Sequence, residues 1–297
     1  MNNKRSGYVA IVGRPNVGKS TLLNHLLKYK ISITSRRPQT TRHAILGIHT
    51  VQNAQVVYVD TPGLHTDAKR AMNRYMNRTA AAVLEDVDAV IFVVEATRWT
   101  EEDESVLERL KRVKAPVFLA VNKVDQIKDK NQLLPVLGLM SKKRDYQDIV
   151  PLSALNGDQV STLENAVINV LPQGEFLYPD DQITDRSERF LAAEIIREKL
   201  TRLLGKEIPY ALTVEIEQFE VEDELTTISS IIWVERDGQK AIVIGKGGHM
   251  LKKVGELARI DIEAMLGHKV FLRLWVKVRE GWSDDERALR SLGYSGS

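Results

Sequence analysis

The first polar stretch of the chain has the residue types and spacing that bind a phosphate group. It follows the pattern G-x-x-x-x-G-K-S, formed by Gly13, Arg14, Pro15, Asn16, Val17, Gly18, Lys19 and Ser20. An apolar run ends at Val12 just before it, and residues 21–27 after it have a helical pattern. In a strand–loop–helix of this kind, successive backbone N–H groups surround phosphate oxygens at the positive end of a helix. We expect Lys19 to reach the outer phosphates and the Ser20 hydroxyl to bind Mg²⁺.

A second stretch, Asp60-Thr61-Pro62-Gly63, follows the apolar residues 56–59 and is followed by Leu64. A carboxylate that follows a strand downstream of the phosphate loop suits a direct or indirect role at Mg²⁺. The Gly63 N–H can donate to a terminal phosphate, and its backbone freedom lets the loop move when that phosphate leaves. The alternative is a plain proline-glycine turn.

Residues 35–42, SRRPQTTR, lie between these two stretches and combine turn formers and charge without periodicity. They predict a mobile loop. We expect Thr41, or failing that Thr40, to bind Mg²⁺ only when a terminal phosphate is present, which is an order–disorder switch. The alternative is the start of a β-strand. Lys19, Thr41 and Gly63 are the candidate catalytic residues.

A third stretch, Asn122-Lys123-Val124-Asp125, is suited to reading a purine base. The Asp125 carboxylate can accept two hydrogen bonds from the edge of guanine, a donor pair that adenine lacks. Asn122 either bonds the base or ties its loop to the phosphate loop, and the Lys123 stem can cover the ring. Ser153 and Ala154 follow another apolar run, and the Ala154 N–H is a candidate contact for the guanine carbonyl oxygen. The alternative is a polar loop that caps a helix.

These stretches must be positioned by regular elements, and the chain is long enough to supply about two domains. Apolar residues make up 43% and charged residues 28%, as in ordinary globular proteins. The net charge of +2 indicates no global attraction to nucleic acid. The absence of cysteine excludes disulfides and thiolate metal sites and fits a reducing compartment. No stretch has the roughly 20 apolar residues of a membrane span.

Apolar strands and helices alternate over the first half of the chain. We expect strands at 45–48, 56–59, 89–94 and 117–121, and helices at 73–84, 102–111, 133–141 and 163–170. This alternation predicts an α/β, doubly wound sheet, in which ligands bind at the carboxyl ends of the strands. Each polar stretch that follows a predicted strand is placed as that rule requires.

A composition change near residue 172 predicts a domain boundary. We expect one domain at residues 1–172, a linker at 173–186 and a second domain at 187–297, because residues 171–181 contain two prolines, a glycine and acidic residues. The second domain is expected to contain a helix at 187–204, strands near 212–217 and 226–236, a turn at Asp237-Gly238, a helix at 249–266 and a strand at 269–278.

The second domain contains a glycine-rich loop suited to RNA. It comprises Ile244, Gly245, Lys246, Gly247 and Gly248. A G-x-x-G loop between two helices lets an RNA backbone approach closely and clamps about four nucleotides. Lys252, Lys253 and Arg273 add positive charge nearby. The alternative is a glycine-rich helix start with solvated lysines.

Taken in order, GRPNVGKS, QTTR, DTPG, NKVD and SAL resemble the five nucleotide-binding motifs of translation-factor-class GTPases. The order helix, strand, strand, helix-GKGG-helix, strand resembles a type II KH domain. Together they resemble the bacterial Era family over nearly the whole chain. The resemblance implies a P-loop NTPase domain of the Ras-like GTPase type followed by an α+β type II KH domain.

The resemblance also implies a function. Members of this family bind GTP and GDP, act in maturation of the small ribosomal subunit, and bind near the 3′ end of its ribosomal RNA. They are cytoplasmic and partly associated with the membrane. Mg²⁺ is implied as cofactor. Asn16 resembles a phosphate-loop asparagine that holds a monovalent cation in some relatives, and K⁺ is the hypothesis for this chain. Leu64 stands where Ras-like enzymes have a water-orienting glutamine, so slow hydrolysis is expected.

Three other functions compete with this hypothesis. One is an RNA-binding assembly factor whose nucleotide site is only structural. Another is a tRNA-modification or tandem-domain ribosomal GTPase, which would not explain GKGG. The third is a P-loop kinase of small molecules, which NKVD disfavours.

Overall fold

The computed structural model describes residues 4–35, 40–63, 70–204 and 208–294. These residues form two compact units. The N-terminal unit contains the described parts of 4–32, 41–63 and 73–185, and the C-terminal unit contains those of 33–40, 70–72 and 186–294.

A six-stranded sheet forms the centre of the N-terminal unit. Its strands are β1 (Arg5–Val12), β2 (Ile45–Val51), β3 (Ala54–Asp60), β4 (Ala89–Glu95), β5 (Val117–Asn122) and β6 (Asp148–Pro151). Their order is β2-β3-β1-β4-β5-β6, and all neighbours are parallel except β2 and β3. Only Gln52 and Asn53 join β2 to β3, a connection too short for a parallel crossover. The expected doubly wound sheet is thus confirmed, with one antiparallel strand at its edge.

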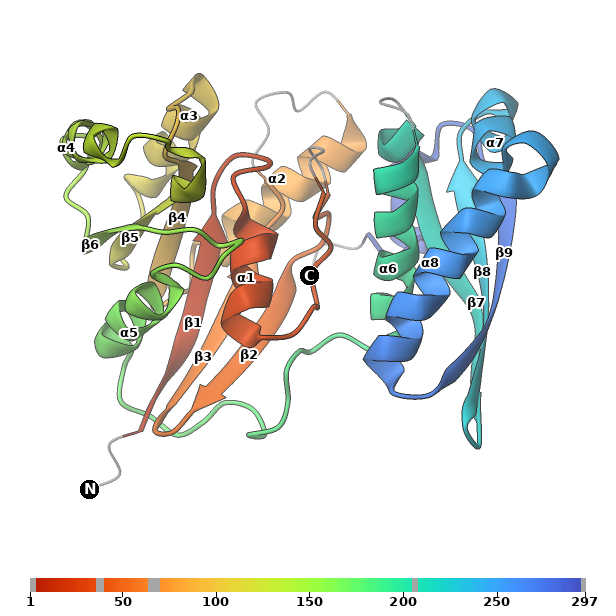
Figure 1. Ribbon diagram of the computed structural model, residues 1–297, viewed down its shortest axis with the longest axis horizontal. Coiled ribbons are helices and arrows are strands. Elements are labelled where there is room, and N and C mark those ends of the chain that lie inside the picture. The colour runs from red at the N-terminus through yellow and green to blue at the C-terminus, as the bar shows by residue number, and fades with distance from the viewer. Residues whose placement is uncertain (1–3, 36–39, 64–69, 205–207, 295–297) are drawn as a thin grey trace. The chain divides into compact units, whose positions relative to one another are not determined.

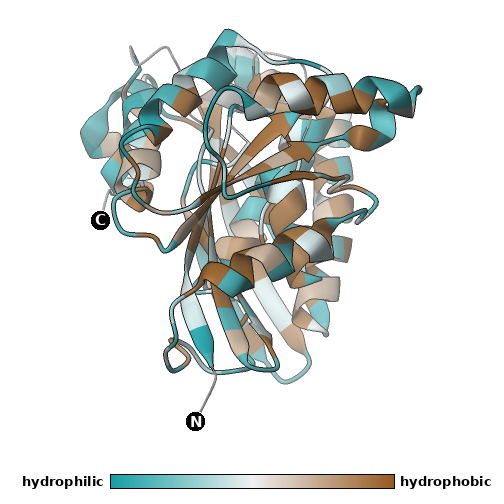
Figure 2. Cartoon of the chain, turned by 90° about the vertical axis from the view of Figure 1, so that its left-hand side faces the viewer, coloured by the Kyte–Doolittle hydropathy of each residue, from teal (hydrophilic) through white to brown (hydrophobic). Residues whose placement is uncertain are grey.

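Helices cover both faces of this sheet. They are α1 (Lys19–Leu27), α2 (Ala71–Val83), α3 (Glu101–Leu110), α4 (Leu133–Ser141) and α5 (Val160–Val170), with short 3₁₀ helices η1 (Val124–Gln126) and η2 (Lys130–Gln132). Figure 1 shows α1 and α5 on one face and α2 and α3 on the other. Residues of α2, α3 and α4 share a core with β1, β4 and β5. Figure 2 shows the strands of the sheet as largely hydrophobic segments, next to helices in which hydrophobic and hydrophilic residues alternate.

The C-terminal unit has the order of elements expected from the sequence. Its elements are α6 (Glu188–Leu203), η3 (Ile208–Ala211), β7 (Leu212–Glu222), β8 (Leu225–Val234), α7 (Asp237–Ile244), η4 (Lys246–Gly248), α8 (His249–Leu266), β9 (Lys269–Val278), η5 (Trp282–Asp284) and α9 (Glu286–Ser291). Strand β8 lies between β7, which is antiparallel to it, and β9, which is parallel to it. Leu200, Ile232 and Ile262 are fully buried in a core that α6 and α8 share with the sheet.

The turn predicted at Asp237-Gly238 is wrong, because α7 begins at Asp237. The side-chain oxygen of Gln239 accepts hydrogen bonds from the backbone N–H groups of Glu235 and Arg236 at 2.9 and 3.1 Å. Backbone N–H groups at the start of a helix have no partner within the helix, so a side chain that accepts their hydrogen bonds stabilises the helix start. The pair Asp237-Gly238 therefore forms the first turn of a helix.

Two short segments from the first half of the chain also belong to the C-terminal unit. Within this unit, the Thr34 N–H donates to Glu198 at 2.9 Å, and Arg197 donates to the Thr40 carbonyl at 2.5 Å. Arg197 in turn is paired with Glu194 at 2.6 Å. Residues 36–39 of the expected mobile loop lie outside the described residues.

Every helix in the described part of the chain is too short or too polar to cross a membrane.

Candidate functional site

The phosphate loop connects β1 to α1, as the pattern predicts. A side chain on Gly18, whose φ is 107°, would bring Cβ within 2.2 Å of the Asn122 side-chain nitrogen, so this position requires glycine. Lys19 is buried, and its Nζ donates to the carbonyls of Gly13 and Arg14 at 2.9 and 3.0 Å. Burial lowers the pKa of Lys19 to about 8, although the Asp60 carboxylate acts in the opposite direction.

Three side chains whose oxygen atoms are suited to bind Mg²⁺ lie close together beside this loop. Ser20 Oγ lies 2.8 Å from Thr41 Oγ1 and donates to Asp60 Oδ2 at 2.8 Å. Among the described residues, Asp60 Oδ1 is buried and has no hydrogen-bond partner. Burial raises the pKa of Asp60, against the effect of Lys19 and the hydroxyls. Hydroxyl and carboxylate oxygens are ligands that Mg²⁺ prefers, so these residues fit the ion.

The two candidate threonines have different contacts in the structure. Thr41 contributes its hydroxyl to this group, whereas Thr40 provides a backbone carbonyl to Arg197 within the C-terminal unit. Thr41 is accordingly the threonine that the geometry favours as a metal ligand.

Ser32 belongs to the same group, although no motif in the sequence marks it. Its hydroxyl donates to Asp60 Oδ2 at 2.8 Å. The side chain of Asn24 on α1 holds this residue, because its oxygen accepts the Ser32 N–H at 3.0 Å and its amide donates to the Ser32 carbonyl at 2.7 Å. A lone serine after a helix carries no recognisable signal in one sequence, so only the fold could reveal it.

The segment after β3 packs against the phosphate loop. Thr61 Oγ1 donates to the Ile11 carbonyl at 2.9 Å, and Pro62 is buried. A Cβ on Gly63 would lie 3.1 Å from Pro15 Cα, so the absence of a side chain allows this approach. The predicted residue Leu64 lies outside the described residues.

The expected base-recognition loops after β5 and β6 are also brought together. Asn122 donates to the Val17 carbonyl at 2.7 Å, and its side-chain oxygen accepts the N–H groups of Lys123 and Ala154 at 2.8 and 2.9 Å. Of the two roles considered for Asn122, the structure has the one that ties loops together. The Ala154 N–H is therefore already a donor to Asn122.

Asp125, the candidate guanine-reading residue, is exposed at the start of η1. Its Oδ1 accepts a hydrogen bond from Ser153 Oγ at 2.5 Å, and the adjacent Val124 N–H donates to the Leu152 carbonyl at 3.3 Å. Ser153 therefore orients this carboxylate.

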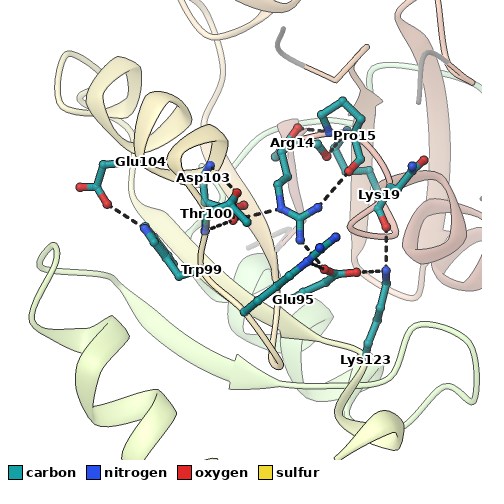
Figure 3. Close-up of polar contacts among 12 residues, drawn as sticks. Arg14, Pro15, Lys19, Glu95, Trp99, Thr100, Asp103, Glu104 and Lys123 are labelled. Carbon is teal, nitrogen blue, oxygen red and sulfur yellow. Dashed lines mark hydrogen bonds and ion pairs between the residues drawn. The ribbon is translucent and has the colours of Figure 1, made fainter. Parts of the chain in front are cut away.

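Arg14 takes part in the loop through its backbone, while its side chain is engaged elsewhere (Figure 3). Its guanidinium is 4% exposed and contacts the carboxylates of Glu95 and Asp103. Asp103 Oδ2 also accepts the Thr100 N–H at 2.9 Å, in the capping box at the start of α3. These carboxylates keep the pKa of Arg14 raised in spite of its burial.

The candidate RNA loop joins α7 to α8, as predicted. Lys246, Lys252 and Lys253 are exposed. Gly247 has φ 60°, which favours glycine, and a Cβ there would meet no atom within 4 Å. The loop thus presents an open backbone and positive charge.

Arg273, by contrast, does not lie with this loop. Leu272 and Leu274 on either side of it pack against the core that α8 covers, so Arg273 faces the opposite side of the sheet. There it lies 4.8 Å from the centre of the Phe271 ring.

Two family models match the chain. Residues 8–123 match the model for a 50S ribosome-binding GTPase, and residues 207–283 match that for a KH domain.

Relatives match over almost the entire chain. GTPase Era of Marinobacter nauticus is 60% identical over 291 residues, covering 98% of this chain and 95% of the relative. GTPase Era of Coxiella burnetii is 58% identical over 97% of both chains.

Two solved structures match closely. An Era variant of Aquifex aeolicus bound to GDP and AlF₄⁻ is 40% identical with a TM-score of 0.95, covering 98% of this chain and all of that one. A structure of Era in complex with MgGDPNP and nucleotides 1506–1542 of 16S ribosomal RNA is 40% identical with a TM-score of 0.96, covering 99% and 100% of the two chains.

Proposed function

Because this chain belongs to the Era family of GTPases, we propose that it binds GTP with Mg²⁺ and hydrolyses it to GDP and phosphate. This proposal rests on one observation: Ser20, Thr41 and Asp60 lie within hydrogen-bond distance of one another beside the phosphate loop. A structure of a relative contains MgGDPNP, which supports the same nucleotide and ion here.

The residues of the site have distinct tasks in this proposal. Lys19 binds the outer phosphate oxygens, and the Gly63 N–H donates to the terminal phosphate. Ser20 and Thr41 would hold Mg²⁺, with Asp60 accepting hydrogen bonds around it, and the ion would neutralise charge on the phosphate oxygens. Leu64, and not a glutamine, directly follows Gly63 in the sequence, so hydrolysis is slow without a partner. An arginine supplied by a partner is worth about 10³–10⁵ in rate.

The base is selected by the loops after β5 and β6. Asp125 accepts two hydrogen bonds from the guanine edge, and Ser153 orients its carboxylate. Asn122 holds the loop in place, and the Lys123 stem covers the ring. A site built on such bonds rejects a base lacking the donors by roughly 10⁴–10⁵.

The C-terminal unit binds single-stranded RNA at the loop from Ile244 to Gly248, with Lys252 and Lys253. The likeness to an Era structure that contains nucleotides 1506–1542 of 16S ribosomal RNA supports the 3′ region of small-subunit ribosomal RNA as the target. Processing of that RNA and assembly of the small ribosomal subunit are the corresponding cellular roles. Arg273, on the other side of the sheet, contributes a separate contact.

The nucleotide state controls RNA binding through the segment before Thr41. Thr34 and Thr40 are bound by α6 within the C-terminal unit, and Thr41, the next residue along the chain, is a candidate metal ligand in the N-terminal unit. A change at Thr41 on hydrolysis therefore acts directly on a segment held by the RNA-binding unit. Equal RNA affinity of the GDP form and the form with a non-hydrolysable GTP analogue would contradict this control.

Two assays test the main proposal. Purified protein should turn over many equivalents of GTP with Mg²⁺, and a single turnover would favour a purely structural nucleotide. Crosslinking to total cellular RNA, with and without a non-hydrolysable GTP analogue, should recover the 3′ end of small-subunit ribosomal RNA. Lys246→Asp with Gly247→Asp should abolish that crosslink and spare GTP binding. As a control, Lys111→Asp with Arg112→Asp changes exposed charge in the other unit and should retain the crosslink.

K⁺ is a second ion that we propose for the phosphate loop. The support is the donor chemistry of Asn16, because amide and carbonyl oxygens replace the hydration shell of K⁺. Hydrolysis should be faster in K⁺ than in Na⁺, and Asn16→Ala should remove the difference. Equal rates in both salts would refute this use of K⁺.

We further propose a cytoplasmic protein with a peripheral membrane contact. Leu134 and Leu139 on α4 are 76% and 67% exposed, and the exposed Lys142 follows the helix. Exposed leucines on a helix beside basic residues suit the surface of an anionic membrane. Co-sedimentation with vesicles of anionic lipid should fall in Leu134→Glu with Leu139→Glu, and unchanged binding would exclude this helix as the contact.

A further inference from the structure

One carboxylate, that of Glu95 at the end of β4, is surrounded by cations from three parts of the N-terminal unit (Figure 3). Oε2 accepts hydrogen bonds from Arg14 of the phosphate loop and, at 2.8 Å, from Arg98. Oε1 accepts a hydrogen bond from Lys123 of the base loop. The Glu95 side chain is only 9% exposed. No local motif in the sequence marks this residue.

The sheet places Glu95 between the two loops. Strand β4 lies between β1 and β5 and is parallel to both. Because Glu95 is paired with Asn122, its carboxylate lies at the end of the sheet from which the phosphate loop and the base loop leave β1 and β5. The Lys123 ammonium also donates to the Asn16 carbonyl in the phosphate loop at 2.8 Å. The Lys123 ammonium therefore contacts both the Glu95 carboxylate and the backbone of the phosphate loop.

The electrostatics favour a permanently charged Glu95. Burial on its own would raise the pKa of Glu95, but hydrogen bonds from Lys123, Arg98 and Arg14 lower it to about 2. Arg14 is almost fully buried, so it depends on Glu95 and Asp103 for its partners. Removing the Glu95 charge would leave a buried cation with one partner fewer, which is costly.

We propose that Glu95 is a positioning residue for guanine nucleotide binding. It fixes the side chains of Lys123 and Arg14 and so keeps the base loop and the phosphate loop in the relative positions that the nucleotide requires. This inference rests on the proposed function, because it concerns the same nucleotide. It also assigns Arg14 a structural role: its charge is committed to Glu95 and Asp103 and does not serve the reacting phosphate.

The test measures dissociation of fluorescent, N-methylanthraniloyl-labelled GDP by stopped flow. Loss of a charged hydrogen-bond partner corresponds to a factor of about 10–100, so Glu95→Gln should dissociate GDP at least about tenfold faster. Affinity for GTP should fall in parallel, while kcat at saturating GTP stays within about twofold. Glu164→Gln is the matched control, because Glu164 is a largely buried carboxylate of the same unit that contacts His49 and Tyr58 instead. It should dissociate GDP at the wild-type rate.

A double-mutant cycle distinguishes positioning from general destabilisation. Lys123→Met keeps an apolar stem and removes the ammonium. In that background Glu95→Gln should have a clearly smaller effect on GDP dissociation than in the wild type. Equal effects in both backgrounds, or an unchanged dissociation rate in Glu95→Gln, would overturn the proposal.

Folding of each variant is checked by circular dichroism. Should Glu95→Gln fail to fold, Glu95→Asp keeps the charge but shortens the side chain, and its GDP dissociation should also be faster; a wild-type rate would overturn the proposal. If the proposed function itself were wrong, the wild-type protein would not bind labelled GDP. That result differs from one in which the wild type binds GDP and Glu95→Gln releases it at the same rate.

Discussion

The side-chain amide of Asn122 donates a hydrogen bond to the backbone carbonyl of Val17 at 2.7 Å, across a separation of 105 residues in the chain. The same side chain accepts the N–H groups of Lys123 and Ala154. One buried amide therefore joins the phosphate loop to both base-recognition loops.

Asn122→Ala should weaken GDP binding and lower the melting temperature. Its removal leaves the Lys123 and Ala154 N–H groups without this acceptor, and each unsatisfied buried group costs about 1–3 kcal/mol. Differential scanning fluorimetry with and without GDP measures both effects. Asn156→Ala, an exposed asparagine near the same loop, serves as control. A wild-type melting temperature and GDP affinity in Asn122→Ala would contradict the structural role of this amide.

Asp125→Asn should change base preference from guanosine to xanthosine nucleotides. The carboxylate accepts two guanine donors, whereas an amide can donate to the extra carbonyl of xanthine. Competition against labelled GDP and labelled XDP measures the ratio, which should change by at least about 10² in favour of XDP. Glu164→Gln should leave the ratio unaltered, and persistence of guanine preference in Asp125→Asn would refute base reading by this residue.

GDP affinity should decrease as the pH rises above about 8. Burial lowers the pKa of Lys19 from its ordinary value of 10.5 to about 8 in the nucleotide-free protein, and phosphate requires the charged ammonium. Affinity should be constant below that pH and then fall by up to about tenfold per pH unit. Titration from about pH 7 to about pH 9 by fluorescence checks this. Lys19→Arg stays charged and should lack this falling limb; the same decrease in that variant would exclude Lys19 as its cause.

The same pKa shift has a consequence for stability. Because the pKa of Lys19 is lower in the folded than in the unfolded protein, this residue decreases the free energy of unfolding. The decrease is fully present below pH 8 in the nucleotide-free protein. Between pH 8 and 10.5 the unfolded chain binds more protons at this group, so its contribution to the free energy of unfolding rises with pH in that window.

Thr41→Ala should slow GTP hydrolysis at least about tenfold while GDP binding changes little. The reason is that Thr41 Oγ1 lies 2.8 Å from Ser20 Oγ, within the group that would hold Mg²⁺ on the triphosphate. Single-turnover hydrolysis over a series of Mg²⁺ concentrations measures the effect. The neighbouring Thr40→Ala is the control and should hydrolyse GTP at close to the wild-type rate; a larger loss in Thr40→Ala would reverse the assignment.

Much of the architecture could be predicted because its signals are local. The runs 89–94 and 117–121 are apolar without alternation, which indicates strands covered on both faces, and they became β4 and β5. The strand at 45–48 was predicted and lies within β2, but its antiparallel direction at the sheet edge was not, and neither was the helix start at Asp237. The direction of β2 follows from its two-residue connection to β3, and the helix start at Asp237 follows from the capping side chain of Gln239. The secondary-structure propensities of single residues indicate neither feature.

The amino-acid sequence alone determined the order of the nucleotide-binding motifs and the GKGG loop, because glycine spacing and strand–loop–helix context are properties of short segments. Only the tertiary structure decided which side chains share a site. Ser32 reaches Asp60, Glu95 joins Arg14 to Lys123, and Arg273 faces away from the core that α8 covers. Such contacts link residues that are far apart in the chain, and their geometry depends on how strands pair and helices pack, which no local pattern records.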